Sequence, residues 1–390
     1  MIYLDHNATT PPTPAVREAV ASAMDQFWQN PSSVHRPGQA VRHAIELARR
    51  DLAALVGVKP RELVFTSGGT ESIDTAIRGV LRPAADDRPR LITTAVEHAA
   101  VRDLAESLGE SAIEVVLLRL DASGRVEPPS VEASLDEARS DGRRALVSVQ
   151  WANNETGVIQ PVHAIGEACR DARVPFHCDA TQWVGKMPTD LASTDAPPID
   201  LMTFSPHKFG GPKGIGLLWA RRGVRWAPAL HGSQELGRRG GTENVPGILG
   251  AGAAARDAME WLEDPSRAEQ IAALRDGFER TVLEGVRPML PEARVNPDGD
   301  AERLWNTTNI AFPTLEAEAL LIAMSERGVC ASAGAACSSG SLDPSPVLLA
   351  MGVPPKLAHG SVRFSLGRET TEAELIEASR VVIDVVRAQC

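Results

Sequence analysis

Three short segments of the chain combine residue types that can hold and activate a charged organic molecule. In Ser67-Gly68-Gly69-Thr70-Glu71-Ser72, small residues lead into the helical run 73–81, so free N–H groups at a helix N-terminus can bind a phosphate. Asp179-Ala180-Thr181-Gln182 and Ser205-Pro206-His207-Lys208 each follow a strand-like run and offer a carboxylate and a lysine. Alone, each has an ordinary explanation: a glycine-rich turn, a helix cap and a surface lysine. The first segment lacks GxxxxGK[ST], which disfavours a nucleotide P-loop.

The elements that position these segments alternate along the first part of the chain. Strand-like runs at 63–66, 90–94, 113–118, 145–149, 174–178 and 201–204 are separated by helical stretches up to about Ala220. Such alternation predicts an α/β fold with a mostly parallel sheet. Because ligands bind at the carboxyl ends of the strands in open α/β sheets, we expect the three segments to meet at one edge.

The pattern changes beyond Gly247. Long helices at 248–262 and 266–283 precede short strands at 309–312, 329–331 and 361–365, which predicts a smaller α+β domain. A chain of 390 residues also exceeds what a single core usually supports. We assign residues 14–257 to the large domain and residues 1–13 with 258–390 to the small one. Residues 86–89 and 121–130 are predicted to be loops.

The three segments gain a joint meaning when their chemistry is combined. A helix-terminal phosphate site, an acid for a pyridinium nitrogen and a lysine that can form a Schiff base together fit pyridoxal 5'-phosphate. Lys208 is preferred over Lys213 as the Schiff-base residue because it lies nearer the strand end, whereas Lys213 sits among turn glycines.

A series of motifs in order resembles one family over nearly the whole chain. The family is the NifS/IscS-like cysteine desulfurases, within the class V aminotransferase superfamily of fold-type I pyridoxal-phosphate enzymes. The motifs are Tyr3-Leu4-Asp5-His6-Asn7-Ala8-Thr9-Thr10, Thr66-Ser67-Gly68-Gly69-Thr70-Glu71-Ser72, Glu97-His98, Asn153-Asn154-Glu155-Thr156-Gly157, Asp179-Ala180-Thr181-Gln182, Ser205-Pro206-His207-Lys208, Gly241-Thr242, Gly334-Ala335-Ala336-Cys337-Ser338 and Val362-Arg363-Phe364-Ser365.

The resemblance implies roles around the cofactor ring. Lys208 would carry the cofactor as a Schiff base, and Asp179 would keep the pyridine nitrogen protonated so that the ring accepts electrons. His98 looks like the family's histidine that stacks on the ring and relays protons. Asn154 and Gln182 would hydrogen-bond the phenolic oxygen of the ring.

The resemblance also implies a phosphate site, a dimer and a substrate site. Gly69, Thr70, Ser205 and His207 would hold the phosphate together with Thr242, which in this family comes from the other subunit, so a homodimer is implied. Arg363, with Asn7 and Asn154, would bind the carboxylate of L-cysteine, because a guanidinium forms a bidentate pair with that planar anion. The ordinary explanation for Arg363 is a surface ion pair.

Cys337 is the candidate nucleophile. It lies in the run 331–341 of mostly small residues, which is expected to be mobile, so that the thiol can reach the substrate and then carry sulfur outward. A free thiol has a pKa of about 8.5, so attack requires a nearby base or positive charge, which His98 or the cofactor complex would supply. The implied reaction gives L-alanine and a persulfide on Cys337 for transfer to a protein acceptor or scaffold.

Composition limits the other classes of function. Five cysteines without a CxxC spacing suggest neither a disulfide framework nor a zinc or other metal site, and Cys169 and Cys178 fall on buried-type runs. The net charge of −11 argues against a general nucleic-acid or anionic-membrane surface, although it leaves room for a local basic site that binds a small anion. No apolar run approaches the roughly 20 residues needed to span a bilayer, and residues 1–12 lack the pattern of a signal peptide, which favours a cytoplasmic protein.

Some questions stay open at this level. Gly69 stands where alanine is common in the family, Pro206 and Gly210 vary the lysine motif, and the chain stops at Cys390, which puts docking to an iron–sulfur scaffold in doubt. A selenocysteine lyase, a C–S lyase or an aminotransferase would share the fold and cofactor, and a sulfur-carrier or scaffold protein without activity would share the fold. The acceptor is also open between iron–sulfur cluster biosynthesis, tRNA thiolation, cofactor thiolation and DNA phosphorothioation.

Overall fold

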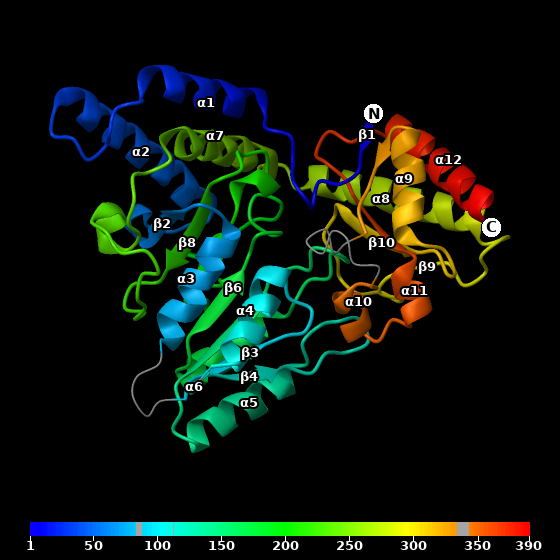
Figure 1. Cartoon of the computed structure of the whole chain (residues 1–390), viewed down its shortest axis with the longest axis horizontal. Helices are drawn as coiled ribbons and strands as arrows, with labels where there is room; N and C mark the ends of the chain where they lie inside the picture. Colours follow the sequence, from blue (N-terminus) through cyan, green and yellow to red (C-terminus); the bar gives the residue numbers. More distant parts are fainter. Residues whose placement is uncertain (83–87, 112, 334–342) are drawn as a thin grey trace.

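The structure, a computed structural model, describes residues 1–82, 88–111, 113–333 and 343–390. Figure 1 shows a large twisted sheet covered by helices on both faces, and a second group of elements, α8 to α12, beside one end of it. The chain enters through this second group, crosses to the sheet and returns, so the N-terminus lies near the last helix.

The large sheet has seven strands in the order β2-β8-β7-β6-β5-β3-β4. Strands β3 to β7 pair in parallel, and β8 is antiparallel to both β7 and β2. Consequently β2, β3, β5, β6 and β7 all end at the same edge. The bounds are β2 (Leu63–Thr66), β3 (Arg90–Thr93), β4 (Glu114–Leu117), β5 (Ala145–Gln150), β6 (Phe176–Asp179), β7 (Leu201–Phe204) and β8 (Gly216–Ala220).

The strands are apolar on both faces because both faces are covered. Leu63 packs into one hydrophobic cluster and its neighbour Val64 into another, as the alternation of side chains along a strand requires. One face carries α1 (Pro14–Gln26), α2 (Arg36–Leu55), α5 (Pro128–Ser140), α6 (Val162–Ala172) and α7 (Val245–Leu262), and the other carries α3 (Gly69–Leu81) and α4 (Ala99–Gly109). Single 3-10 turns occur at Pro60–Glu62, Pro206–Lys208 and Gln234–Gly237.

The second group has its own hydrophobic cluster, which includes Leu4 and residues between Ile271 and Val386. Its sheet has the order β12-β10-β9, and β1 pairs in parallel with β11. The bounds are β1 (Ile2–Tyr3), α8 (Ser266–Val286), β9 (Arg294–Val295), β10 (Thr307–Ala311), α9 (Ala317–Glu326), β11 (Val329–Cys330), α10 (Pro346–Ala350), α11 (Pro355–His359), β12 (Ser361–Ser365) and α12 (Glu372–Gln389).

The α/β fold with a mostly parallel sheet is confirmed, with differences in detail. Helix α3 begins at Gly69 rather than at residue 73, because the N–H of Ser72 already bonds the carbonyl of Gly68 at 3.1 Å. Asp179 is the last residue of β6 rather than the first residue after it, and α5 begins at Pro128, inside the predicted loop 121–130. Of the predicted loop 86–89, only 88–89 are described. The division into residues 14–257 and 1–13 with 258–390 stays a prediction.

Candidate active site

Nine of the predicted site residues line one cavity of about 260 Å³ at the carboxyl edge of the sheet. They come from the ends of five strands or the segments that follow them, which is where an open parallel sheet leaves backbone groups unpaired. The nine are Gly69, Thr70, His98, Asn154, Asp179, Gln182, Ser205, His207 and Lys208.

One end of the cavity is suited to a phosphate. The first turn of α3 offers backbone N–H groups that have no acceptor within the helix, and Gly68 has open space where a Cβ would stand. Ser205 faces this turn, since a Cβ on Gly69 would lie 2.8 Å from its hydroxyl oxygen. His207 Nδ1 lies 3.1 Å from Thr9 Oγ1, and burial, with Lys208 nearby, lowers the pKa of His207 to about 4. His207 therefore contributes hydrogen bonding rather than charge at neutral pH.

Asp179 is held by neighbours on one of its two oxygens. Oδ1 accepts hydrogen bonds from the backbone N–H of Thr181 at 3.0 Å, from its hydroxyl at 2.6 Å and from the hydroxyl of Thr203 at 3.4 Å. These contacts fix the plane of the carboxylate at the end of β6 and leave Oδ2 as the oxygen for a ring nitrogen in the cavity.

Lys208 closes the single 3-10 turn that follows β7. Its Nζ donates to the carbonyl oxygens of Asn7 at 2.7 Å and Ala8 at 2.9 Å. The amine therefore has a defined position at the cavity, set by the N-terminal segment, whereas Lys213 is exposed. The preference for Lys208 rested on sequence position, and this placement supports it.

His98 begins α4 as its capping residue. Nδ1 accepts the N–H of Ala100 at 3.1 Å, so the proton of the neutral ring is assigned to Nε2. Burial lowers the pKa of His98, an effect that Lys208 reinforces and Asp179 opposes. A proton that this ring takes up is therefore readily given away.

A buried hydrogen-bond network lies behind the cavity and joins Asn7, Gln182 and Lys186. Lys186 Nζ donates to Asn7 Oδ1 at 2.7 Å and to Gln182 Oε1 at 2.6 Å, and Gln182 Nε2 donates to the Asn7 carbonyl at 3.0 Å. One N–H of the Gln182 amide is then left for a ligand. Asn154 Oδ1 is buried without a hydrogen-bond partner among the described residues, as expected of an amide that awaits a ligand.

Arg363 on β12 is buried, with only 2% of its side chain exposed. One of its terminal nitrogens lies 2.7 Å from Asp5 Oδ1, and the other donates to the carbonyl of Asn154 at 3.0 Å. Arg363 therefore has a carboxylate partner, as the ion-pair interpretation predicted, but the pair is buried and not at the surface. Arg363 lies behind Asn154 rather than among the residues that line the cavity.

Thr242 is not part of this arrangement. Thr242 is exposed and does not line the cavity of its own chain. Cys337 lies outside the described residues. Cys169 and Cys178 are buried, as predicted, and burial raises the pKa of the Cys169 thiol to about 12, with Asp200 adding to the effect.

Three residues that contribute to the site were not identified from the sequence. Lys186 follows Gln182 by four residues, and this spacing was its only signal. Glu97 was part of a recognised motif without a role: its oxygens accept from the Thr94 hydroxyl at 2.7 Å and from the Gln150 N–H at 2.9 Å, and burial raises its pKa to about 8. Asp5 had no signal besides its place in the first motif.

The described residues contain no group of three or more histidine, cysteine or acidic side chains placed to hold a metal ion. Within the same part of the chain, every helix is too short or too polar to cross a lipid bilayer.

Known proteins resemble this chain over nearly all of its length. The family model described as aminotransferase class-V matches residues 2–377. A cysteine desulfurase of Nostoc sp. is 44% identical over 387 residues, which cover 99% of this chain and 93% of that protein. Among solved structures, a NifS-like protein has a TM-score of 0.88 at 32% identity and covers 99% of both chains. SspA in complex with cysteine has a TM-score of 0.78 at 32% identity and covers 95% of this chain and all of that one.

Proposed function

Because the chain belongs to the class-V aminotransferase family and is a cysteine desulfurase, we propose that Lys208, His98 and Cys337 share the removal of sulfur from L-cysteine. The observation that carries this proposal is the single cavity that collects nine predicted residues at the carboxyl edge of the sheet. The cysteine bound in the similar SspA structure supports the substrate.

The residues of the cavity fit pyridoxal phosphate. The first turn of α3, Ser205 and His207 would hold the phosphate, Oδ2 of Asp179 the ring nitrogen, and the amides of Asn154 and Gln182 the phenolic oxygen. When bound, the cofactor withdraws electrons from the carbons next to the substrate amine. Lys208 would form the Schiff base with it.

The side chains of the protein then transfer protons and hold the reacting groups in position. Once Lys208 is a free amine, the carbonyls of Asn7 and Ala8 hold its Nζ at the cavity, where it can take a proton from the substrate Cα. Nε2–H of His98 would serve as a donor to the substrate, and the lowered pKa of His98 makes its protonated form an effective acid. His98 therefore assists proton movement near the reacting atoms.

Sulfur transfer needs no external oxidant. The Cys337 thiolate attacks the substrate sulfur, so an S–S bond forms as the substrate Cβ–S bond breaks and its electron pair moves toward Cβ. Protonation of that carbon leads to L-alanine, and the sulfur stays on Cys337 as a persulfide. A later acceptor thiol removes it, which restores the Cys337 thiol.

Arg363 is proposed to bind the substrate carboxylate with Asn7 and Asn154. Its contact with the Asn154 carbonyl supports this role because the same guanidinium also reaches toward a residue that lines the cavity. Asp5 holds one terminal nitrogen of the guanidinium and so fixes its plane.

A homodimer is proposed on the basis of Thr242 and its surroundings. Thr242 is exposed and stands apart from its own cavity, as a residue that completes a partner's phosphate site has to be. Leu236, nearby in sequence, is 78% exposed, which suits an interface. The protein acceptor or scaffold, a role in iron–sulfur cluster biosynthesis and a cytoplasmic location stay predictions.

The experiment is turnover of L-cysteine by purified protein with a thiol reductant, scoring alanine and sulfide together. We expect equal amounts of both, and loss of both in Cys337→Ala. The control is Cys390→Ser, which removes an exposed thiol that does not line the cavity.

Other outcomes would change the assignment. Pyruvate with sulfide would indicate a C–S lyase, a keto acid would indicate an aminotransferase, and turnover only with L-selenocysteine would indicate a selenocysteine lyase. Turnover indifferent to Cys337 would remove the nucleophile from the scheme.

A further inference from the structure

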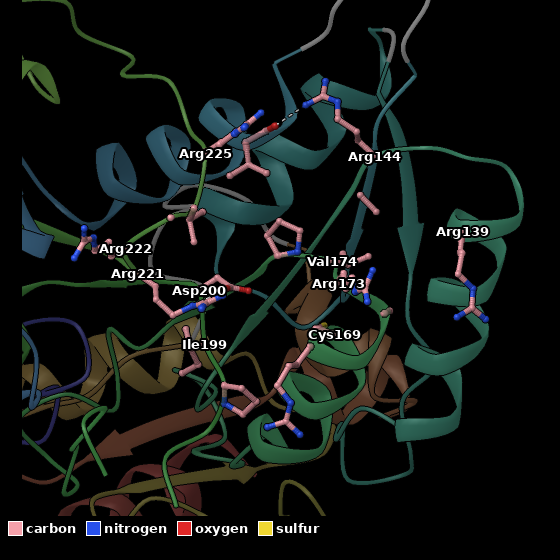
Figure 2. Close-up of a pocket in the computed structure, with 18 of the residues that line it drawn as sticks. Arg139, Arg144, Cys169, Arg173, Val174, Ile199, Asp200, Arg221, Arg222 and Arg225 are labelled. Carbon is pink, nitrogen blue, oxygen red and sulfur yellow. Dashed lines mark hydrogen bonds and ion pairs between the residues drawn. The ribbon is translucent and has the colours of Figure 1, made fainter. Parts of the chain in front are cut away.

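A second and larger cavity, of about 990 Å³, lies at the opposite edge of the large sheet from the candidate active site. The amino ends of β5, β6 and β7 border it, and so does the segment after β8. Figure 2 shows the labelled arginines arriving from separate segments around it, with Arg221, Arg222 and Arg225 on one side and Arg139 on the other. An occupant here would not touch the catalytic groups.

The charge of this cavity contrasts with that of the whole chain. Among the described residues, eight arginines and a single carboxylate, that of Asp200, line it, whereas the protein carries a net charge of −11. Asp200 is already engaged: Oδ1 accepts from Arg221 Nε at 2.8 Å, and Oδ2 accepts from the Phe176 N–H at 2.9 Å. The lining therefore has no free acid among the described residues.

Some of the arginines are balanced by acids outside the cavity. Arg139 pairs with Asp136 at 2.6 Å, Arg170 lies 3.7 Å from Glu167, and Arg143 pairs with Glu114. Arg144 donates to backbone carbonyls, one of which is marked in Figure 2. These side chains shape the cavity wall more than they supply unbalanced charge.

Three exposed arginines, Arg173, Arg222 and Arg225, have side chains without a hydrogen bond or ion pair to any described residue. The C-terminus of helix α6 carries a partial negative charge, which favours basic residues such as Arg170 and Arg173 at that end. It does not explain Arg222 and Arg225, which follow a strand. Their guanidinium groups remain available to an outside anion.

Arg173 carries an additional signal in its backbone. It ends α6 with φ 58° and ψ 34°, a left-handed conformation in which glycine is the residue of lowest cost. Keeping an arginine there costs roughly 1 kcal/mol relative to glycine. The match of its charge to the negative end of α6 offsets part of this cost.

We propose that this cavity binds a phosphorylated small molecule of nucleotide size. Guanidinium groups match phosphate oxygens with paired hydrogen bonds, and the volume lies in the range of ligand pockets. The inner wall includes Val174, Ile199 and Pro198, which suit an apolar or aromatic portion next to the phosphates. The concave shape favours a compact ligand over the flat surface of an acidic protein.

The test is binding of magnesium-free ATP and of inorganic triphosphate to the full chain loaded with its cofactor, so that the catalytic phosphate site is filled. Calorimetry compares wild type with the double variant Arg222→Ala/Arg225→Ala and with Arg173→Gly. We expect each to weaken ATP binding at least tenfold. Arg173→Gly also relieves the left-handed strain, so its melting temperature should match or exceed that of wild type. The control, Arg50→Ala/Arg280→Ala, removes two exposed arginines elsewhere and should change binding less than twofold.

The two probes separate the sources of the anion. Tighter binding of ATP than of triphosphate supports the proposal of a molecule of nucleotide size. Equal affinity would overturn it in favour of an inorganic polyphosphate, because the apolar part of the lining would then contribute nothing to binding. Absent binding, or equal weakening in the control, would overturn it. Binding of a polyglutamate peptide but not of ATP would also overturn it, in favour of an acidic protein partner.

Discussion

Lys186 supports the candidate active site from behind, and the change Lys186→Met tests how. Nζ of Lys186 is buried and donates to Asn7 Oδ1 and Gln182 Oε1. Methionine has a similar length but no donor. Asn7 Oδ1 would keep the Asn306 amide at 3.0 Å, whereas Gln182 Oε1 would lose the partner that holds it. A buried acceptor without a partner costs about 1–3 kcal/mol.

The charge of Lys186 gives this variant a distinctive dependence on pH. Burial lowers the pKa of Lys186 well below its usual 10.5, and Lys208, Arg363 and Arg368 act in the same direction. A neutral amine has two N–H groups, which match the two acceptors. Between the lowered pKa and 10.5, the unfolded chain binds a proton that the folded chain lacks. The stability of wild type therefore rises with pH in that window, by up to about 1.4 kcal/mol per pH unit, and the methionine variant lacks this contribution.

The assay is urea unfolding of both proteins at pH 7, 8 and 9, together with the control Lys356→Met, whose side chain is 56% exposed. We expect the difference between wild type and Lys186→Met to grow with pH and the control difference to stay constant. Because Gln182 and Lys208 share the Asn7 carbonyl, we also expect kcat/KM for L-cysteine to fall roughly tenfold, a loss of about 1.4 kcal/mol. A difference that stays constant from pH 7 to 9 would show that the folded protein keeps the proton on Lys186, and the matched-donor argument would be refuted.

Three further changes probe other contacts. Burial raises the pKa of Glu97 to about 8, so between about pH 5 and 8 the folded chain holds a proton that the unfolded chain has released, and stability falls as pH rises. Glu97→Gln should therefore raise the urea midpoint at pH 9 and change it little at pH 5, whereas an equal shift at both pH values would contradict this. Glu235→Leu should lower the free energy of unfolding by about 3–5 kcal/mol, because it leaves Arg49 buried without the carboxylate that lies 2.6 Å away. The double variant Arg49→Met/Glu235→Leu should recover most of this loss in the same urea measurement. Gly69→Ala places a Cβ 2.8 Å from Ser205 Oγ and forces that hydroxyl to turn, so the Kd of the cofactor, measured by absorbance, should rise roughly threefold to tenfold. Tighter cofactor binding would show that Ser205 does not hold the phosphate.

The sequence was sufficient to predict the sheet and most of the cavity because both depend on local pattern. The buried parallel strands are continuous apolar runs, and Asp179 and Lys208 stand out as charged residues at their ends. Because the carboxyl ends of the parallel strands share one edge of the sheet, polar residues at several strand ends are enough to predict a site there. Strand β8 was not identified because its glycine-rich approach resembles a loop, and only pairing with β2 and β7 makes it a strand.

Contacts between distant parts of the chain could not be predicted in the same way. Lys186 looks like a surface lysine in sequence, and its burial depends on Asn7, which is 179 positions away. The carbonyl of Ala8 holds Lys208, but a backbone oxygen carries no signal in the residue type. Likewise, nothing local to Arg363 indicates Asp5, which lies 358 positions away.

These distant contacts converge on residues 5–8, which join the two groups of elements. Arg363 and Ser365 lie two residues apart on β12, and they contact Asp5 and the Asn7 N–H, the latter at 2.9 Å. Leu4, the residue before this segment, packs in the core of the second group. Within the segment, the carbonyl of Asn7 accepts a hydrogen bond from Lys208. A shift of β12 is therefore transmitted to Arg363 and Lys208 together. The group proposed to bind the substrate carboxylate and the amine proposed to act on the substrate are thus positioned by the same strand.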